Sequence, residues 1–163
     1  MRNNDVLRRI RYTFDLSDSK MIAIFGLADY PITRAQLSDW LKKEDDSAFK
    51  NCGDTQLAAF LNGLINDRRG KKEGVLAKPE KRINNNIILR KLKIAFNLKD
   101  DELLDILTLA DLPLSRHELS AFFRKPGHTN YRGCKDQVLR HFLKGLQQKY
   151  RPNEQPETPF SWE

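Results

Sequence analysis

Two stretches of this chain, 82 positions apart, share seven of their twelve residues and decide its fold. Residues 27–38 read LADYPITRAQLS, and residues 109–120 read LADLPLSRHELS. Extending the comparison in both directions gives 23 identical residues among the 62 positions from Asn3 to Leu64, without a gap. Self-similarity at a fixed period indicates a repeated supersecondary unit. The chain is therefore predicted to be a tandem duplication.

Each copy has the apolar spacing of helices. In the first copy Val6, Ile10 and Phe14 recur at helical intervals, and their counterparts do so in the second. Thr33 followed by Gln36 forms a capping box, the pattern that starts a helix, and the second copy repeats it. Alternating β-branched runs, which would favour strands, are missing. The sequence predicts an all-α fold, a pseudo-symmetric helical bundle made of a duplicated four-helix unit.

The repeat also predicts the division of the chain. The two copies should superpose, related by an approximate twofold axis or by a solenoid step, and the asparagines that open each copy are expected to be N-caps. Gly63 and Gly145 predict a close approach of helices, where the fourth helices pack. The predicted segments are a first helical repeat at 1–65, a basic linker at 66–84, a second helical repeat at 85–151 and a flexible acidic and aromatic tail at 152–163.

Composition limits the class of protein. The chain has 163 residues, a net charge of +7 and 39% hydrophobic residues, enough for a real core. No apolar run approaches the roughly 18–20 residues that cross a bilayer, and no secretory h-region follows the N-terminus. Two cysteines make neither a disulfide framework nor a metal-binding pair. We expect a soluble, cytoplasmic protein.

Several motifs resemble a known family. Residues 82–96 read RINNNIILRKLKIAF, residues 60–65 read FLNGLI, residues 142–146 read FLKGL, and residues 40–45 read WLKKED. These motifs are similar to those of the YehS-like family of duplicated bacterial proteins, whose domain has no known function. The resemblance covers roughly residues 1–150 and implies a small cytoplasmic bacterial protein with two similar helical domains. It implies no catalytic residues.

The positive charge is concentrated in one part of the chain. Residues 1–65 are neutral overall, residues 66–84 carry +4, residues 85–151 carry +6 and the tail carries −3. Phosphates are the natural partners of such a field. We therefore expect a non-enzymatic nucleic-acid-associated protein that binds DNA in preference to RNA, in its specific form a bacterial transcriptional regulator. The candidate phosphate contacts are Arg68, Arg69, Lys71, Lys72, Lys81, Arg82, Arg90, Lys91, Lys93 and Arg116.

Two alternatives to nucleic-acid binding stay open at this stage. The basic residues can simply keep the surface soluble, because charge alone does not identify a target. The duplicated bundle can also be a protein-interaction or oligomerisation module. Heparin retention that falls steeply with salt would favour phosphate binding.

The second and third helices of each copy resemble a helix–turn–helix. In DNA-binding versions of that motif, the first residues of the second helix read base edges in the major groove. The readers would be Arg34 and Gln36 in the first copy, and Arg116, His117 and Ser120 in the second. The alternative is an ordinary corner between two helices, which the missing turn glycine favours.

Other reactive side chains give weaker signals. Cys52 and Cys134 each precede a helix, whose dipole can lower a thiol pKa, but small packing residues are the favoured interpretation. His117, His128 and His141 match no metal-ligand spacing, so neither a metal nor a cofactor is predicted.

The C-terminal tail combines prolines, acidic residues and aromatic residues. Its prolines should prevent it from continuing the eighth helix. Phe160 and Trp162 suggest that it docks on the basic surface or on a partner.

Overall fold

The computed structural model describes residues 1–70 and 77–152 and confirms the all-α duplication. The first half contains α1 (Asn3–Thr13), α2 (Asp18–Leu27), α3 (Arg34–Leu41) and α4 (Asp54–Arg69). The second half contains α5 (Asn85–Ala95), α6 (Asp100–Leu109), α7 (Arg116–Ala121) and α8 (Asp136–Tyr150). No strand occurs within the described ranges. None of the helices in these ranges is both long enough and apolar enough to cross a membrane.

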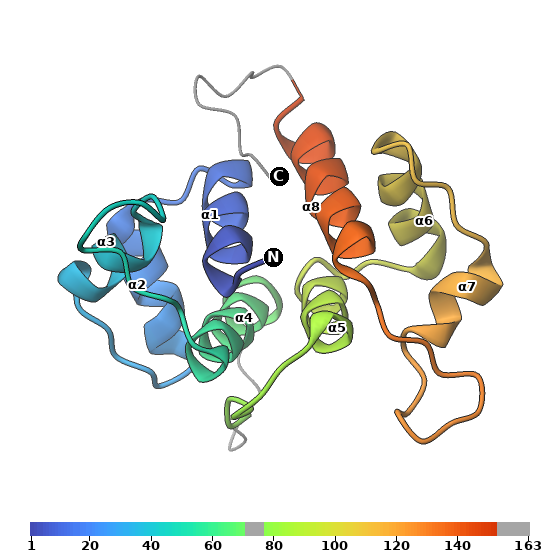
Figure 1. The fold of residues 1–163 in the computed structure, drawn as a ribbon, viewed down its shortest axis with the longest axis horizontal. Helices are drawn as coiled ribbons and strands as arrows, with labels where there is room; N and C mark the ends of the chain where they lie inside the picture. Colours follow the sequence, from blue (N-terminus) through green and yellow to red (C-terminus); the bar gives the residue numbers. More distant parts are fainter. Residues whose placement is uncertain (71–76, 153–163) are drawn as a thin grey trace.

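The two halves pack reciprocally. Figure 1 shows α1 beside α8 and α4 beside α5 in the middle of the molecule, with α2, α3, α6 and α7 towards the outer ends. Because α5 is the counterpart of α1 and α8 the counterpart of α4, these two interfaces are equivalent under the repeat. Each half therefore presents the same surface to the other, as in an isologous contact between two subunits. An approximate twofold axis therefore relates the halves, the first of the two predicted arrangements.

Equivalent residue pairs support this axis. Phe14 stacks on its counterpart Phe96, with ring centroids 4.8 Å apart and planes 19° from parallel. The backbone N–H of Ile83 donates to Asp54 across the interface at 3.1 Å. The amino group of Met1 donates to Asp136 at 2.9 Å in the equivalent position. The amide of Asn85 and this amino group lower the pKa of Asp136.

Several helix boundaries have a local cause. The predicted capping boxes are present: the Oγ1 of Thr33 accepts from the backbone of Gln36 at 3.1 Å, and the Oγ of Ser115 accepts from Glu118 at 3.0 Å. Asn84 caps α5 as predicted. The prediction was wrong for α1, whose N-cap is Arg2; Asn3 and Asn4 lie inside that helix and bind the loop before α4 instead.

The predicted close approach of helices at Gly63 and Gly145 is present, and the partner is the second helix of each half. A Cβ at Gly63 would lie 1.9 Å from the carbonyl oxygen of Ile24, and one at Gly145 would lie 2.2 Å from that of Ile106. Each glycine therefore lets the fourth helix of its own half approach the second helix of that half.

The segments at 66–84 and 152–163 are described only in part. α4 continues through Arg69, so residues 66–69 are helix rather than linker, and Gly70 ends it at a φ of 83°. α8 ends at Tyr150, in agreement with the expected stop before Pro152. The predicted docking of Phe160 and Trp162 lies outside the described residues, as do Lys71 and Lys72.

Candidate anion-binding surfaces

Arg68 and Arg69 lie at the junction of the two halves. Arg68 lies over the stacked pair, with its Cζ 5.5 Å from the Phe14 ring centroid and 4.8 Å from that of Phe96. Arg69 donates across the junction to the carbonyl of Ile94 at 3.3 Å and to Asn97 at 2.6 Å. Both side chains are exposed, yet both also hold the halves together.

The basic residues on and before α5 point in different directions. Lys81, Arg82 and Arg90 are exposed. Lys91 turns inward, where its Nζ contacts Asn62 at 2.6 Å and Glu80 at 3.1 Å. This pairing makes Lys91 a poor phosphate contact among the predicted residues.

Lys93 lies on the same face of α5 as Arg90. Its Nζ pairs with Asp100 at 3.0 Å and lies 5.0 Å from the ring centroid of Phe123. It therefore joins the start of α6 to the end of α7 at the surface.

The helix–turn–helix candidates lie at the ends of the molecule. Arg34 contacts Asp18 at 3.3 Å, and Arg116 pairs with Asp101. Both arginine side chains are more than 60% exposed, so these ion pairs leave them accessible. Asp29 and Asp111 adopt left-handed conformations in the turns, with φ of 53° and 62°.

Asp29 and Asp111 take the left-handed position that a glycine usually occupies in such a turn. Asp is one of the few non-glycine residues that tolerate the left-handed region, because its short side chain can bond locally. The absence of glycine therefore does not argue against the motif. Base reading by these helices stays a prediction.

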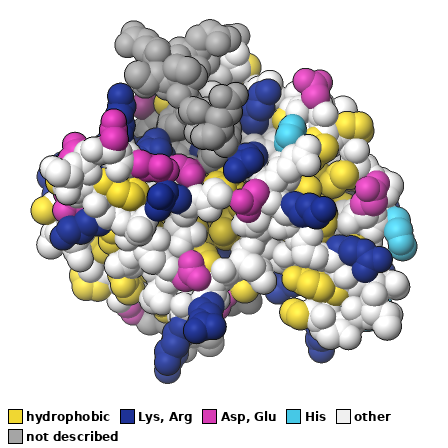
Figure 2. All heavy atoms as spheres, in the orientation of Figure 1, with side chains coloured by type: hydrophobic (Ala, Val, Ile, Leu, Met, Phe, Trp, Pro, Cys, Tyr) yellow, Lys and Arg dark blue, Asp and Glu magenta, His cyan; other side chains and the backbone are white. Residues whose placement is uncertain are grey.

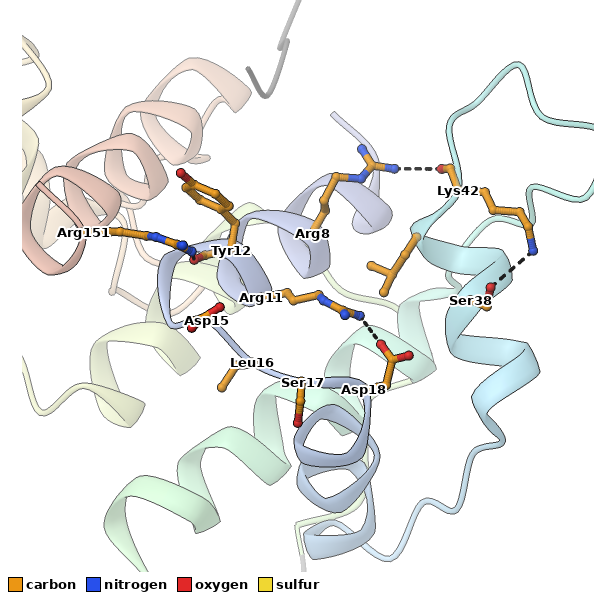
Figure 3. Close-up of a pocket in the computed structure, with 11 residues that line it drawn as sticks. Arg8, Arg11, Tyr12, Asp15, Leu16, Ser17, Asp18, Ser38, Lys42 and Arg151 are labelled. Carbon is orange, nitrogen blue, oxygen red and sulfur yellow. Dashed lines mark hydrogen bonds and ion pairs between the residues drawn. The ribbon is translucent and has the colours of Figure 1, made fainter. Parts of the chain in front are cut away.

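A hollow of about 850 Å³ opens on the first half, beside the end of α8, and is edged by four cations. Arg8 and Arg11 come from α1, Lys42 directly follows α3, and Arg151 directly follows α8 (Figure 3). Leu16 and Leu41 form its apolar part, and Asp15, Asp18, Ser17, Ser38 and Tyr12 complete the lining. We call the four cations the first cationic surface.

Hydrogen bonds fix these four side chains. Figure 3 shows Arg8 reaching the backbone carbonyl of Lys42, 2.9 Å away, and Arg11 reaching the carboxylate of Asp18, 2.5 Å away. The Nζ of Lys42 pairs with Asp39 at 2.6 Å. Arg151 donates to the carbonyl of Tyr12, and its Cζ lies 4.1 Å from the centroid of that ring. The cations are thus held around the hollow before any ligand arrives.

The repeat places four cations at the same positions on the other half. Shifting each residue by 82 turns Arg8, Arg11 and Lys42 into Arg90, Lys93 and Arg124, and Arg69 is the counterpart of Arg151. We call these four the second cationic surface. Three of them, Arg69, Arg90 and Lys93, were predicted from the sequence. Arg124 was missed, although the comparison between copies could have found it.

The second cationic surface is the more positive of the two. Lys99 replaces Ser17 beside it, and Asn97 replaces Asp15. The change adds one cation and removes one carboxylate, which fits the larger net charge of the second half. On the face in Figure 2, Lys and Arg are spread over both halves with Asp and Glu between them, so local clusters matter more than a uniform patch.

The cysteines are packing residues. Cys52 and Cys134 are buried free thiols, and burial raises the pKa of each to about 12. The helix dipole therefore does not create a reactive thiolate here. His117, His128 and His141 belong to no metal-binding cluster among the residues that the structure describes.

Both thiols should consequently resist modification in the folded protein. With a pKa near 12, only about one thiol in ten thousand is ionised at pH 8. We expect a thiol-reactive disulfide reagent to label neither cysteine until the chain unfolds, so that labelling follows the urea unfolding curve. Rapid native-state labelling of either residue would contradict its burial.

Together these observations define a small all-helical protein made of two four-helix halves about a pseudo-twofold axis, with an equivalent cationic surface on each half. The chain belongs to the DUF1456 family, a protein family of unknown function, whose matches cover residues 3–70 and 85–151. These two matches coincide with the two halves. The chain is 47% identical over 147 residues to the uncharacterized protein YehS of Escherichia coli (strain K12), covering 90% of this chain and 94% of that protein. No solved structure matches it.

Proposed function

We propose that this chain is a non-enzymatic, cytoplasmic nucleic-acid-associated protein whose second half contacts phosphates. The observation that carries the proposal is the second cationic surface, where Arg69, Arg90, Lys93 and Arg124 are joined by Lys99. Arg90 and Lys93 lie on α5, while Asn97 holds Arg69 at the end of α4 and Asp100 pairs with Lys93. An array of fixed cations neutralises successive phosphates and releases their counterions.

The pseudo-twofold axis supports duplex DNA over single-stranded RNA as the target. A DNA duplex also has local twofold symmetry, and dimeric regulators use it by placing equivalent elements on two half-sites. This chain carries both halves of such an arrangement in one molecule, with the second half as the main phosphate contact because it is the more positive. Transcriptional regulation is the specific role that this arrangement favours.

The test measures binding to a short DNA duplex over a series of salt concentrations. Arg90→Gln combined with Arg124→Gln should reduce the slope of log affinity against log salt by about 2, one unit for each lost phosphate contact. The matched control is Lys43→Gln with Lys50→Gln, which removes the same charge from an exposed loop of the first half. Fluorescence anisotropy gives both slopes.

Arg68 and Arg69 are left unchanged in this test, because their contacts between the halves would confuse binding with folding. Equal slopes for the two double variants would reject the second cationic surface as the contact. Failure of the unaltered protein to bind duplex DNA or RNA at low salt would reject the whole proposal.

A second candidate function is protein interaction, and one surface feature favours it. Leu109 is 52% exposed and lines a hollow of about 370 Å³ with Ile106 and Lys149, between α6 and α8. A protein partner would bury this leucine. Binding through it would survive high salt, because the contact is apolar.

A further inference from the structure

The two cationic surfaces have equivalent cations but different side chains between them. In the second half, the counterpart of Leu41 is the larger Phe123, and the counterpart of Ser17 is the longer Lys99. Lys93 packs over the Phe123 ring, 5.0 Å from its centroid. In the first half the smaller residues leave the hollow of about 850 Å³. The copies have therefore diverged in the side chains between the cations, while the four cationic positions are kept.

The first-half hollow has the properties of a small-molecule site. Its volume lies in the range of about 300–1,000 Å³ that such sites occupy. It combines an apolar part, Leu16 and Leu41, with hydroxyl groups from Ser17 and Ser38. Four cations and two carboxylates, Asp15 and Asp18, line the hollow, while Asp5 and Asp39 pair with Arg8 and Lys42 from outside that lining.

We propose that this hollow binds a small phosphate monoester that carries a flat ring, a molecule of mononucleotide size. The guanidinium groups of Arg8 and Arg11 suit the phosphate, because their planar fork matches its oxygens. The N-terminus of α2, capped by Ser17, adds its positive end to the same place. The flat ring of the ligand lies on Leu16 and Leu41, beside Tyr12. The guanidinium group of Arg151 lies over the ring of Tyr12.

The inference is independent of the proposed nucleic-acid binding, because it concerns the other half and a monomeric ligand. A polymer would follow the more positive second surface, where Phe123 and Lys99 occupy the equivalent positions. A mononucleotide needs a hollow that takes its ring as well as charge. Each surface therefore predicts its own ligand, and the two predictions can fail separately.

The experiment uses the full chain and isothermal titration with adenosine 5′-monophosphate. Ser38 is exposed on α3 and lines the hollow, so Ser38→Glu places a carboxylate there without disturbing the core. Its counterpart Ser120→Glu makes the same change beside the second cationic surface. We expect Ser38→Glu to weaken nucleotide binding by about tenfold or more, and Ser120→Glu to leave it within about twofold.

Duplex DNA binding should show the reverse pattern, with a larger loss for Ser120→Glu than for Ser38→Glu. Inorganic phosphate and adenosine are the component probes, and each should bind at least about tenfold more weakly than the nucleotide. Equal affinity for inorganic phosphate and the nucleotide would overturn the assignment of the ring. Equal losses of nucleotide affinity in the two variants, or no nucleotide binding at millimolar concentration, would overturn the site.

Discussion

Replacing Gly63 with Ala is expected to lower the free energy of unfolding by at least about 3 kcal/mol. The added Cβ would lie 1.9 Å from the carbonyl oxygen of Ile24 and 3.1 Å from its Cγ2. A backbone carbonyl inside α2 cannot rotate away, so the two helices must separate. Alanine regains only about 1 kcal/mol of helix propensity, which the steric cost exceeds.

Thermal unfolding followed by circular dichroism measures this effect. For a chain of this size, about 3 kcal/mol corresponds to a fall of roughly 6–12 °C in Tm. Gly145→Ala should produce a similar fall, because its Cβ would lie 2.2 Å from the carbonyl oxygen of Ile106. Agreement between the two would confirm that both halves use glycine for the same close approach.

Gly26→Ala is the matched control. Gly26 also lies inside a helix, α2, but a Cβ there meets nothing within 4 Å. This substitution should leave the protein unchanged or stabilise it by up to about 1 kcal/mol. If Gly63→Ala cost no more than Gly26→Ala, the close contact between α2 and α4 would be wrong.

The helices and the duplication could be predicted because both follow from patterns that are visible in the sequence itself. Capping boxes such as Thr33 with Gln36 act within one turn, and the repeat needs no structure to be seen. The local patterns do not decide between a twofold axis and a solenoid step. That choice depends on long-range packing, namely the stacking of Phe14 on Phe96, to which no local pattern points.

The end of α4 shows why the linker was placed too early. Residues 66–69 are polar and charged, which resembles a linker. However, Arg is a good helix former, and the helix ends only at Gly70, whose positive φ suits glycine. Packing of Arg68 on the aromatic pair of the junction holds this last turn.

The candidate site was predictable in part. The charge distribution identified Arg69, Arg90 and Lys93, but the first-half hollow was missed because that half has no net charge. Acidic residues cancel its cations in the net charge of that half: Asp18 pairs with Arg11, and Asp39 pairs with Lys42. Comparing charge position by position between the copies would have revealed it.

Replacing Asn4 with Ala is expected to cost about 4 kcal/mol, the other large effect. Asn4 is 1% exposed and makes three hydrogen bonds, one to the last turn of α3 and two to the loop between α3 and α4. It donates to the carbonyls of Trp40 and Lys50, at 2.8 and 2.9 Å, and accepts from the N–H of Cys52 at 3.0 Å. Alanine would leave those buried backbone groups without partners, which costs more than the bonds themselves.

The second half repeats the same arrangement. Asn86 donates to the carbonyls of Phe122 and Arg132, at 3.1 and 2.8 Å, and accepts from the N–H of Cys134 at 2.8 Å. Asn86→Ala should therefore cost a similar amount. Asn84→Ala is the control, because Asn84 is exposed and caps α5 with one bond, whose loss costs about 1 kcal/mol.

Urea unfolding gives the three free energies, and hydrogen exchange locates the damage. In Asn4→Ala the amide of Cys52 should lose its protection, while the amide of Cys134 keeps the protection set by global unfolding. A cost for Asn4→Ala no greater than that for Asn84→Ala would show that the loop is held by other contacts. The loop begins at Lys42, whose carbonyl orients Arg8, so its release should also disorder the first cationic surface. Nucleotide binding by Asn4→Ala should then weaken even at temperatures where the chain remains folded, because the substitution loosens the cations without removing any of them.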